Sequence, residues 1–426
     1  MIKNEIYNLC KKIQPIYRSI TGPGNVQTLR ILKKINKNLK ILKFVSGKKV
    51  FDWTIPKVWK IKNAWIKNEN SGKKIINFED NLLSVVGYSD SVNKVLSYKE
   101  LIKKIHTSKM NPRSTPYVTS YYKKDWGFCM PQIIKNKLSK NSKYRVFINS
   151  KKKNGDLSVG EIFIPGKRKE EILLTTYICH PFMANNELSG PAVLIFLSKW
   201  IQKKKRKFSY RILFSSETIG TICYINHNFK RLKTKVLAGY VLTCLGDEKL
   251  FSYLKSKSEN SLSDKIALPV FKKLKYKKKI YNWLQRGSDE RQFNAPGVEL
   301  NIGSIMRSKY KTFKEYHTSA DSLGKLVTSD GLFQSYNFIK KIIKRIEKSH
   351  IPTSNIVCEP FLSKRQMYPT LSKAGNISKI QNDTWNFLSF CNGNYLIEEI
   401  ANKIKITNSQ ALRIAKILKK HKIIEF

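Results

Sequence analysis

Glu171-Ile-Leu-Leu-Thr-Thr-Tyr-Ile-Cys179 is a near-continuous apolar run, and His180-Pro-Phe-Met-Ala-Asn-Asn-Glu-Leu-Ser-Gly190 follows it directly. Runs of this kind are typical of strands that are buried on both faces, as in parallel sheets. In open α/β sheets, binding sites form just beyond the carboxyl ends of the strands. The stretch therefore predicts a central strand with polar, chemically active residues at its end.

Strands and helices alternate after this first strand. We expect strands at 209–215, 236–245 and 298–304, and helices at 188–203, 219–229, 261–274 and 331–347. This alternation favours an α/β fold with a mixed, mostly parallel sheet and helices on both faces. Before the first strand, the runs 144–149 and 157–165 flank Asn154-Gly155, which predicts a β-hairpin.

Five segments are expected along the chain. Residues 1–47 and 136–350 form the α/β domain, and 48–135 form an inserted β-rich domain that is dense in Trp and Tyr. Residues 351–375, with Pro352, Pro360 and Pro369, are expected to be a linker. Residues 376–426 read as three short helices and a final strand, which is a helix-turn-helix pattern.

The charge of the chain is strongly positive, with 81 Lys+Arg against 30 Asp+Glu and a formal net charge of +51. Only 14 of the 81 cations are arginine, although arginine is the better partner for phosphates and guanine edges. The lysines accompany heavy use of Ile and Asn, which fits A/T-rich coding and solvated faces. Three arginines do cluster in two loops, where they either pair with nearby carboxylates or receive an anionic substrate group: Arg286, Arg291 and Arg307.

The seven cysteines are scattered, with no C-x-x-C pair, which favours reduced thiols in a cytosol. The first residues lack the apolar core of a signal peptide, and the apolar runs are too short for a membrane helix. We therefore expect a soluble, cytoplasmic protein with no membrane partner.

Candidate site residues follow the expected strand ends. His180 follows the first strand, Glu217 follows 209–215, and Asp247 follows 236–245; the later loops add Arg286, Asp289, Arg307, Tyr316, His317 and Asp321. Two histidines and a carboxylate from separate strand ends form a donor set for a catalytic zinc with an open position. A further carboxylate would be the base for water.

Each of these residues also has a structural explanation. A single histidine is commonly a hydrogen-bonded, partly buried side chain. Glu217 could begin a helix, where a carboxylate interacts favourably with the helix dipole. Asp289 and Asp321 could cap local turns.

The motifs quoted above, together with Glu217-Thr-Ile-Gly220, Arg286-Gly-Ser-Asp-Glu-Arg-Gln292 and Glu315-Tyr-His-Thr-Ser-Ala-Asp321, resemble a family of bacterial aminopeptidase-like proteins. That family is similar to the zinc exopeptidases of the bacterial leucyl aminopeptidase type and is often found in surface-polysaccharide gene clusters. The resemblance covers nearly the whole chain. It implies a zinc-exopeptidase-like fold with an inserted β-domain and a C-terminal winged-helix-like domain.

The resemblance also implies roles for single residues. His180 and His317 would be metal ligands and Glu217 the general base of a zinc-dependent amide hydrolase, with Asn186 at the position of a third ligand. The family usually has Asn-Asp-Asn where this chain has Asn185-Asn186-Glu187. A neutral amide is a poorer zinc ligand than a carboxylate. Glu187 is a weaker candidate that would swing in only if the loop shifts, because its adjacent position is expected to point it elsewhere.

Two further carboxylates of the wider exopeptidases correspond to Thr218 and to about Thr243. One zinc ion, weakly held, is therefore expected in place of two. Arg286, Arg307 or Tyr316 would orient a small peptide or amide substrate.

Three other functions remain open. The loss of the ligand carboxylate at Asn186 could leave a pseudoenzyme that binds an amide without turnover. The same residues could deacylate an N-acyl amino sugar. In the helix expected at 410–421, Arg413, Lys416 and Lys420 lie opposite an apolar face, which would suit nucleic acid or a protein-docking domain. We expect a protein partner there rather than nucleic acid, and the oligomeric state stays open.

Overall fold

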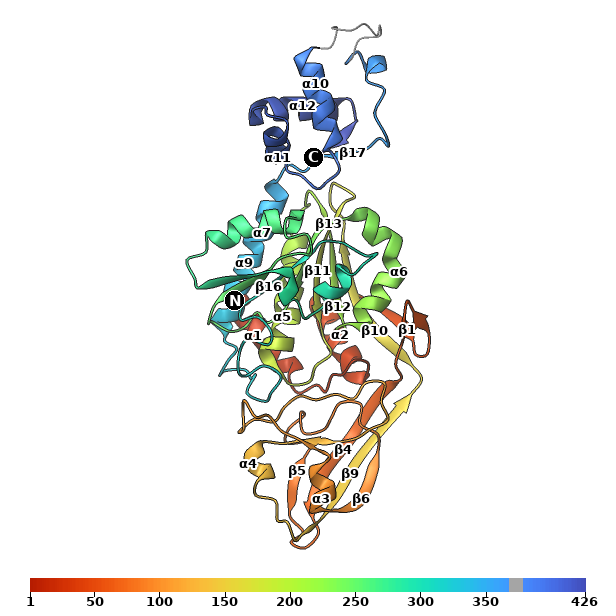
Figure 1. The fold of residues 1–426 in the computed structure, drawn as a ribbon, viewed down its shortest axis with the longest axis vertical. Helices are drawn as coiled ribbons and strands as arrows, with labels where there is room; N and C mark the ends of the chain where they lie inside the picture. Colours follow the sequence, from red (N-terminus) through yellow and green to blue (C-terminus); the bar gives the residue numbers. More distant parts are fainter. Residues whose placement is uncertain (368–377) are drawn as a thin grey trace. The chain divides into compact units, whose positions relative to one another are not determined.

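The computed structural model describes residues 1–367 and 378–426, which divide into two compact units, Met1–Ile342 and Ile343–Phe426. The first unit contains an eight-stranded sheet in the order β1-β10-β12-β11-β13-β16-β14-β15 (Figure 1). Its strands are β1 (Lys40–Val45), β10 (Asp156–Ile164), β12 (Ser209–Ser215), β11 (Glu171–Tyr177), β13 (Val236–Leu242), β16 (Gly303–Met306), β14 (Phe251–Leu254) and β15 (Lys278–Tyr281).

The centre of this sheet is parallel, antiparallel pairs lie on either side of it, and the edge strand β15 is again parallel to its neighbour β14. β11 pairs in parallel with β12 and β13, and β13 pairs in parallel with β16. β10 is antiparallel to β12 and β1, and β14 is antiparallel to β16. All seven residues of β11 are buried. The predicted mixed, mostly parallel α/β sheet is confirmed.

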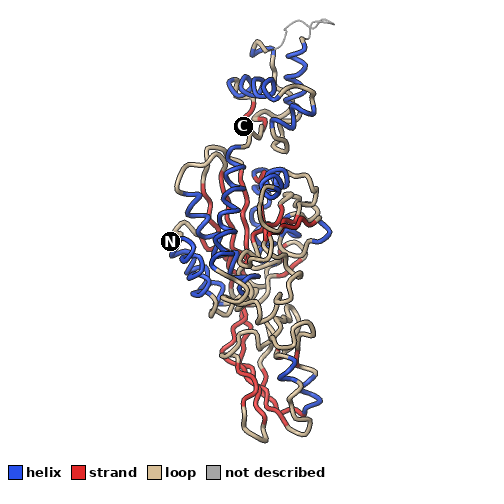
Figure 2. The backbone as a smooth tube through the Cα atoms, turned by 90° about the vertical axis from the view of Figure 1, so that its left-hand side faces the viewer, coloured by secondary structure: helices blue, strands red, loops and turns tan. Residues whose placement is uncertain are grey.

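Helices cover both faces of the sheet (Figure 2). On one face, α5 (Ser189–Gln202) contacts β11 and β12 and lies against α1 (Ile2–Ile13) and α2 (Pro23–Ile35). On the other face, α6 (Ile219–Lys235) packs its apolar residues against Leu173 of β11. The other helical elements of the α/β part are α7 (Leu262–Lys272), α8 (Glu290–Phe293), α9 (Ser329–Lys348), whose last residues belong to the second unit, the π-helix η1 (Ala184–Leu188) and the short 3-10 helix η2 (Trp283–Gln285).

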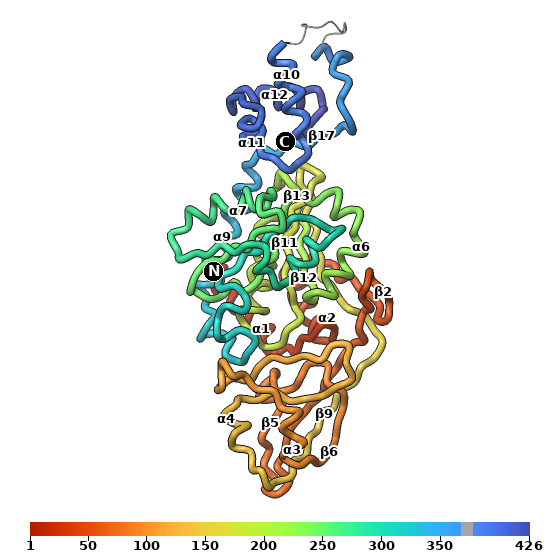
Figure 3. Tube along the Cα trace, in the orientation of Figure 1, coloured from red at the N-terminus to blue at the C-terminus, as the bar shows by residue number. Residues whose placement is uncertain are grey.

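The inserted module has its own four-stranded antiparallel sheet in the order β5-β4-β9-β6, and it is the orange and yellow part of Figure 3. Its elements are β4 (Val58–Asn68), β5 (Lys74–Asn77), β6 (Val92–Ser97), α3 (Tyr98–Ile102), β7 (Ile105–His106), β8 (Phe128–Cys129), α4 (Gln132–Lys135) and β9 (Lys143–Lys153), with the ribbon β2 (Lys49–Val50) and β3 (Trp53–Thr54) before it. Because β9 belongs to this sheet, the module extends to Lys153, beyond the boundary expected at residue 135.

The predicted hairpin around Asn154-Gly155 is wrong. In the described residues β9 pairs with β4 and β6, whereas β10 pairs with β1 and β12, so the two strands belong to different sheets. A two-residue type I′ turn requires positive φ at both positions, and Gly155 is not among the glycines with positive φ. The chain instead runs on from one sheet into the other at this point.

The C-terminal unit is a small helical domain with a two-stranded ribbon. It contains α10 (Lys379–Ser389), α11 (Ile397–Lys403) and α12 (Asn408–Lys420), and its final strand β18 (Ile424–Glu425) pairs with β17 (Thr353–Ser354). Leu362, near the 3-10 helix η3 (Ser363–Arg365), is buried in the same core. The expected linker at 351–375 is therefore wrong in its first part, and its remainder lies outside the described residues, at 368–377.

The apolar face of α12 is buried as predicted, through Ala411, Ile414, Ala415 and Leu418, and its basic residues are exposed. Among the helices in the described part of the chain, none is both long and apolar enough to cross a membrane.

Gly190 allows α5 to approach the sheet closely. A Cβ added there would lie 2.1 Å from Thr176 Oγ1 and 2.8 Å from the carbonyl oxygen of Leu242. Gly190→Ala should lower the free energy of unfolding by about 1–3 kcal/mol, because the buried strands cannot make room for a methyl group. Urea denaturation measures the loss. Lys199→Ala, at an exposed position of the same helix, is the control, and equal midpoints for the two variants would contradict the close packing.

Candidate functional site

The candidate site lies where the connections from the central strand diverge. β11 is flanked by β12 and β13, and α5 and α6 lie on opposite faces of the sheet. In open α/β sheets, binding sites form at such a point, beyond the carboxyl ends of the strands. His180 follows β11, Glu217 follows β12 and Thr243 follows β13.

His180 is buried and held by a carboxylate. Its Nδ1 lies 2.7 Å from Oε2 of Glu187, and its backbone N–H donates to Oε1 of the same residue at 2.8 Å. With Nδ1 engaged, Nε2 faces Glu217, whose Oε2 lies 3.8 Å away. The expectation that Glu187 points elsewhere is therefore wrong, because the π-helix η1 turns its side chain back onto His180.

Glu217 is the carboxylate nearest to the free nitrogen of His180. Its Oε1 accepts a hydrogen bond from Ser288 Oγ at 2.9 Å, and its backbone N–H donates to Cys179 Sγ at 3.2 Å. Burial raises the pKa of Glu217, although His180 and the Ser288 hydroxyl oppose the rise. A raised pKa makes this carboxylate better suited to accept a proton and release it again during a reaction.

Asp289 is a second buried carboxyl next to Glu217. Its two oxygens accept from the Thr218 backbone N–H and the Thr221 hydroxyl, each at 2.8 Å. Burial and the charge of Glu217 raise its pKa to about 8. The sequence offered Asp289 as a candidate site residue or a cap; its contacts show that it fixes the start of α6 beside Glu217.

His317 and Tyr316 lie beside His180. The ring centroids of the two histidines are 5.3 Å apart, and the Tyr316 ring stacks on His317 at 3.9 Å. Burial and the neighbouring His180 hold the pKa of His317 well below its usual range, so its imidazole stays neutral. The structure thus brings together the two histidines that the sequence placed at separate strand ends.

Strained backbone gathers around these residues. Four non-glycine residues next to or within the site have positive φ: Phe182, Thr218, Cys244 and His317. Such conformations persist where the surrounding structure enforces them, and they are frequent at functional sites.

The side-chain amide of Asn186 is buried and makes no hydrogen bond with the described part of the chain. The backbone N–H of Asn186 donates to Asp321 Oδ2 at 3.0 Å and its carbonyl accepts from Thr243 Oγ1 at 3.2 Å. The side-chain Oδ1 and Nδ2 are both buried and have no hydrogen-bond partner among the described residues. Buried polar atoms without partners are rare and call for a ligand, a water molecule or an ion.

Asp247 and Asp321 hold the loops. Asp321 Oδ1 accepts the backbone N–H of Asn185 at 2.5 Å, and Asp247 Oδ2 accepts from Asn185 Nδ2 at 2.9 Å. Asp247 also accepts from the backbone and hydroxyl of Ser308. Both carboxylates, which the sequence offered as weaker site candidates, are engaged in positioning the segment that carries Asn186.

Of the three clustered arginines, only Arg291 lies beside Glu217. Its charge lowers the pKa of Glu217, and its guanidinium donates to Thr218 Oγ1 at 3.3 Å. Arg286 is exposed and stacks on Trp283. Arg307 is buried, packs 4.0 Å from the Phe251 ring centroid and donates to Gln334. The structure therefore does not bring Arg286 or Arg307 to the histidines.

The inserted module contributes a side chain that the sequence did not identify. The ring centroid of Tyr117 lies 4.9 Å from that of His180 and 5.2 Å from that of His317. Its hydroxyl is 3.1 Å from that of Tyr121. No local pattern could have found this contact, because it joins parts of the chain that are far apart in sequence.

The donor set fits one metal ion better than a cluster with thiolate. Cys179, His180 and Glu187 have ligand atoms within 4.8 Å of one another, but Glu187 is engaged with Nδ1 and the backbone of His180. Burial raises the pKa of the Cys179 thiol well above its usual range, which leaves a protonated, poor ligand. The free Nε2 of His180, the neutral His317 and the unsatisfied Asn186 amide are the atoms that would suit a single ion.

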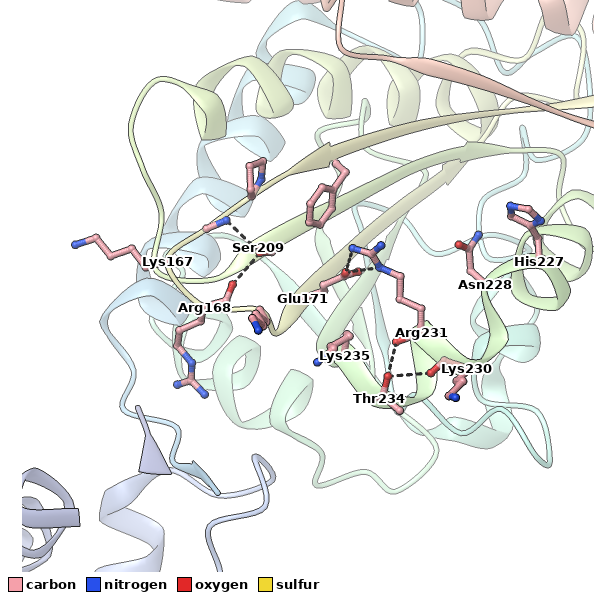
Figure 4. Close-up of a pocket in the computed structure, with 14 residues that line it drawn as sticks. Lys167, Arg168, Glu171, Ser209, His227, Asn228, Lys230, Arg231, Thr234 and Lys235 are labelled. Carbon is pink, nitrogen blue, oxygen red and sulfur yellow. Dashed lines mark hydrogen bonds and ion pairs between the residues drawn. The ribbon is translucent and has the colours of Figure 1, made fainter. Parts of the chain in front are cut away.

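A separate cavity of about 850 Å³ lies at the other end of β11 and β12, next to the second half of α6 (Figure 4). Glu171 in its lining pairs with the guanidinium groups of Arg211 and Arg231. Its lining contains none of the predicted site residues. This cavity is therefore distinct from the histidine site.

Asp289→Asn should flatten the pH dependence of stability. An unfolded aspartate loses its proton near pH 4, whereas folded Asp289 keeps it to about pH 8. Since the folded state binds more protons between these values, the free energy of unfolding falls as the pH rises through this window. Urea denaturation of metal-free protein at pH 5 and pH 8 should show a smaller fall in the variant. Asp80→Asn, at an exposed position, is the control, and equal falls in both variants would contradict this role.

Comparison with known proteins gives two family matches. Residues 7–349 match a family described as "Domain of unknown function (DUF4910)", and residues 350–426 match a winged helix-turn-helix family. A Clostridium acetobutylicum protein, named as a polysaccharide biosynthesis protein with an aminopeptidase-like domain, is 42% identical over 365 residues, which are 85% of this chain and 83% of that protein.

Solved structures agree on the fold. A crystal structure of a Clostridium acetobutylicum protein described as a peptidase superposes with a TM-score of 0.79 at 38% identity, over 99% of this chain and 96% of that chain. A zinc aminopeptidase from Bacillus subtilis has a TM-score of 0.57 at 13% identity, over 81% of this chain and 95% of that chain. The latter likeness shows the fold alone. The chain therefore belongs to the DUF4910 family, with a zinc-aminopeptidase-like α/β fold and a C-terminal winged-helix domain.

Proposed function

We propose that the chain is a metal-dependent amide hydrolase of the aminopeptidase type, with Glu217 as its general base. The observation that carries the proposal is the placement of Glu217, whose carboxylate lies 3.8 Å from the free nitrogen of His180 and is 23% exposed. A partly accessible carboxylate with a raised pKa, next to two histidines, suits proton transfer to and from a substrate.

One zinc ion would be held by His180, His317 and Asn186. When bound, zinc polarises an amide carbonyl and makes water a stronger acid. Glu187 keeps the His180 ring in one orientation, which is the usual role of a carboxylate behind a ligand histidine. The low charge of this donor set predicts weak binding, because no carboxylate ligand offsets the charge of the ion.

Glu217 would move the proton during hydrolysis. The oxygen of the attacking water bonds to the amide carbon, and the carboxylate of Glu217 takes the proton that this water loses. As the C–N bond breaks, Glu217 passes the proton to the nitrogen of the leaving amine. Ser288 donates to the other carboxylate oxygen and so fixes the direction in which Glu217 points. Arg291 and Tyr316, which lie next to Glu217 and His317, would orient the substrate.

The substrate is a small amide. A peptide or aminoacyl amide fits the aminopeptidase-like fold. An N-acyl amino sugar fits the name of the Clostridium acetobutylicum relative, which refers to polysaccharide biosynthesis. Both substrates present the same scissile bond, so hydrolysis of each is tested side by side.

A second candidate is a binding protein without turnover. The neutral Asn186 side chain favours it, because this amide occupies the place expected for a ligand carboxylate and is left without a partner. In this case an amide ligand, rather than an ion, would satisfy the buried amide group.

Glu217→Gln should abolish hydrolysis while leaving bound zinc in place. Loss of a general base typically costs 10²–10⁴-fold in rate, and the uncharged amide cannot accept the proton. Aminoacyl anilides and N-acyl amino sugars, assayed with added zinc, measure the rate, and mass spectrometry of the protein measures the metal. Glu299→Gln is the control, because Glu299 pairs with Lys257 at the surface.

The outcomes separate the two candidates. Hydrolysis by the unmodified protein that is lost in Glu217→Gln but kept in Glu299→Gln supports the enzyme. If the protein binds no zinc and hydrolyses none of these amides, but binds one of them in calorimetry, the second candidate, a binding protein without turnover, is supported.

Ser288→Ala should move the acid limb of the pH–rate profile to higher pH. The Ser288 hydroxyl stabilises the charged form of Glu217 and so lowers its pKa. Removing the hydroxyl raises that pKa further, and a base that must be deprotonated then becomes active only at higher pH. The measurement is kcat/KM from pH 5 to pH 9. An unchanged acid limb would show that Glu217 is not the titrating base.

A further inference from the structure

The inserted module reaches the histidines through one short segment. Backbone contacts join it to the His317 loop: the N–H of Tyr117 donates to the carbonyl of His317 at 2.8 Å, and the N–H of Ser319 donates to the carbonyl of Thr115 at 2.8 Å. Thr115 N–H also donates to Ser319 Oγ at 3.0 Å. Residues 115–117 and 317–319 thus form a short antiparallel ladder, with Pro116 bridged to Thr318.

This ladder fixes an unfavourable backbone conformation. His317 has φ of 53°, in the left-handed region that side chains with a Cβ rarely adopt. Such a residue keeps its conformation only when its neighbours enforce it. The hydrogen bond from the Tyr117 N–H fixes the direction of the His317 carbonyl and so helps to hold this residue in place.

The ring of Tyr117 lies against both imidazoles, and the three ring centroids are 4.9 to 5.3 Å from one another. It meets both rings edge to face, with interplanar angles of 60° to His180 and 87° to His317. Tyr316 stacks on His317 with an interplanar angle of 15°. His317 is therefore confined by one aromatic ring in parallel and by another at nearly a right angle.

The phenol is itself held in place within the module. Its hydroxyl pairs with Tyr121, whose ring packs edge-on against Tyr88 at 5.3 Å. Tyr88 stacks on Trp59, and its hydroxyl donates to the carbonyl of Thr21 in the α/β part of the same unit. A series of contacting aromatic side chains thus connects the site to the place where the inserted module contacts the α/β part.

We propose that Tyr117 is a positioning residue of the site: its ring sets the orientation of the His180 and His317 imidazoles, and its segment makes the inserted module a part of the metal-binding and substrate-binding site. The proposal deepens the proposed function, since it rests on the two histidines being ligands. It gives the inserted module a role in orienting the two proposed ligand histidines.

Nuclear magnetic resonance of the histidine rings tests the orientation without any substrate. The chain has six histidines, and labelling their Cε1 atoms gives one signal for each. Tyr117→Leu should shift the signals of His180 and His317 by more than the loss of the tyrosine ring current alone produces, because the imidazoles turn when the edge-to-face ring is lost, and leave the other four in place. His180→Gln and His317→Gln assign the two signals. Tyr117→Phe, which keeps the ring and loses only the hydroxyl, should give signals close to those of the unmodified protein.

Trp65→Leu is the matched control. Trp65 stacks on Phe147 at 5.2 Å within the sheet of the inserted module, so this variant also loses an aromatic pair of the module. It should lower stability without shifting the signals of His180 and His317. Shifts of equal size in this variant and in Tyr117→Leu would overturn the proposal, as would unchanged His180 and His317 signals in a folded Tyr117→Leu.

Zinc affinity gives the second measurement, by competition with a chromogenic chelator. Loss of groups that orient metal ligands typically weakens binding by 10–100-fold, so Tyr117→Leu should weaken zinc binding by this amount and Tyr117→Phe should not. If Tyr117→Leu does not fold, Tyr117→Phe decides: signals of His180 and His317 that move far from their normal positions, although the ring is kept, overturn the proposal. A protein that binds no zinc at all contradicts the proposed function, whereas the histidine signals still decide whether Tyr117 orients the rings.

Discussion

The carboxylate of Asp321 ties together the two segments on which the site depends. Its oxygens accept the backbone N–H groups of Asn185 and Asn186, and its own carbonyl accepts that of Ala184. Asp321 ends the loop that carries His317, and the three N–H groups open the π-helix that returns Glu187 to His180. These three hydrogen bonds hold the loop that carries His317 against the segment that follows His180. The Asn185 side chain, held by Asp247, then fixes the same segment from its other side.

The sequence predicted the parts of the site that follow from strand order. His180 and Glu217 were found because each follows a long buried strand, and parallel strands end at one edge of the sheet. The four-residue strands β14 and β15 were missed, since such short runs carry no periodicity. The hairpin prediction at Asn154-Gly155 was wrong because this residue pair occurs both in tight turns and in extended connections between sheets. Only the strands with which the flanking segments pair can distinguish the two cases. The role of Glu187 depends on a π-helical turn, and that of Tyr117 on a tertiary contact, so neither leaves a signal in local sequence.

The electrostatics of the site differ sharply from those of the chain as a whole. The net charge of +51 arises mainly from lysines, yet the charged groups around His180 are the carboxylates of Glu187 and Glu217 and one arginine, Arg18, which donates to its carbonyl. Burying Glu217 beside Asp289 raises the pKa of both carboxyls, which costs stability whenever they ionise. Their hydrogen bonds to Ser288, Thr218 and Thr221 offset part of that cost. A surface lysine far from this buried pair has little influence on it, because solvent and salt screen the charge of the lysine.

In the proposed site, the neutral ligand set and the contacts of the inserted module both affect how firmly a metal ion would be held. A metal ion held by charged ligands is kept in place by attraction, whereas one held by imidazoles and an amide depends more on how well these groups are oriented in advance. His180 is oriented by Glu187 through Nδ1, but no carboxylate contacts the His317 ring among the described residues. For His317 the orientation comes from packing, with Tyr316 stacked on one side and Tyr117 edge-on. In the proposed site, where the amide of Asn186 would stand in for a ligand carboxylate, a rigid aromatic frame matters more, and the inserted module supplies one side of it.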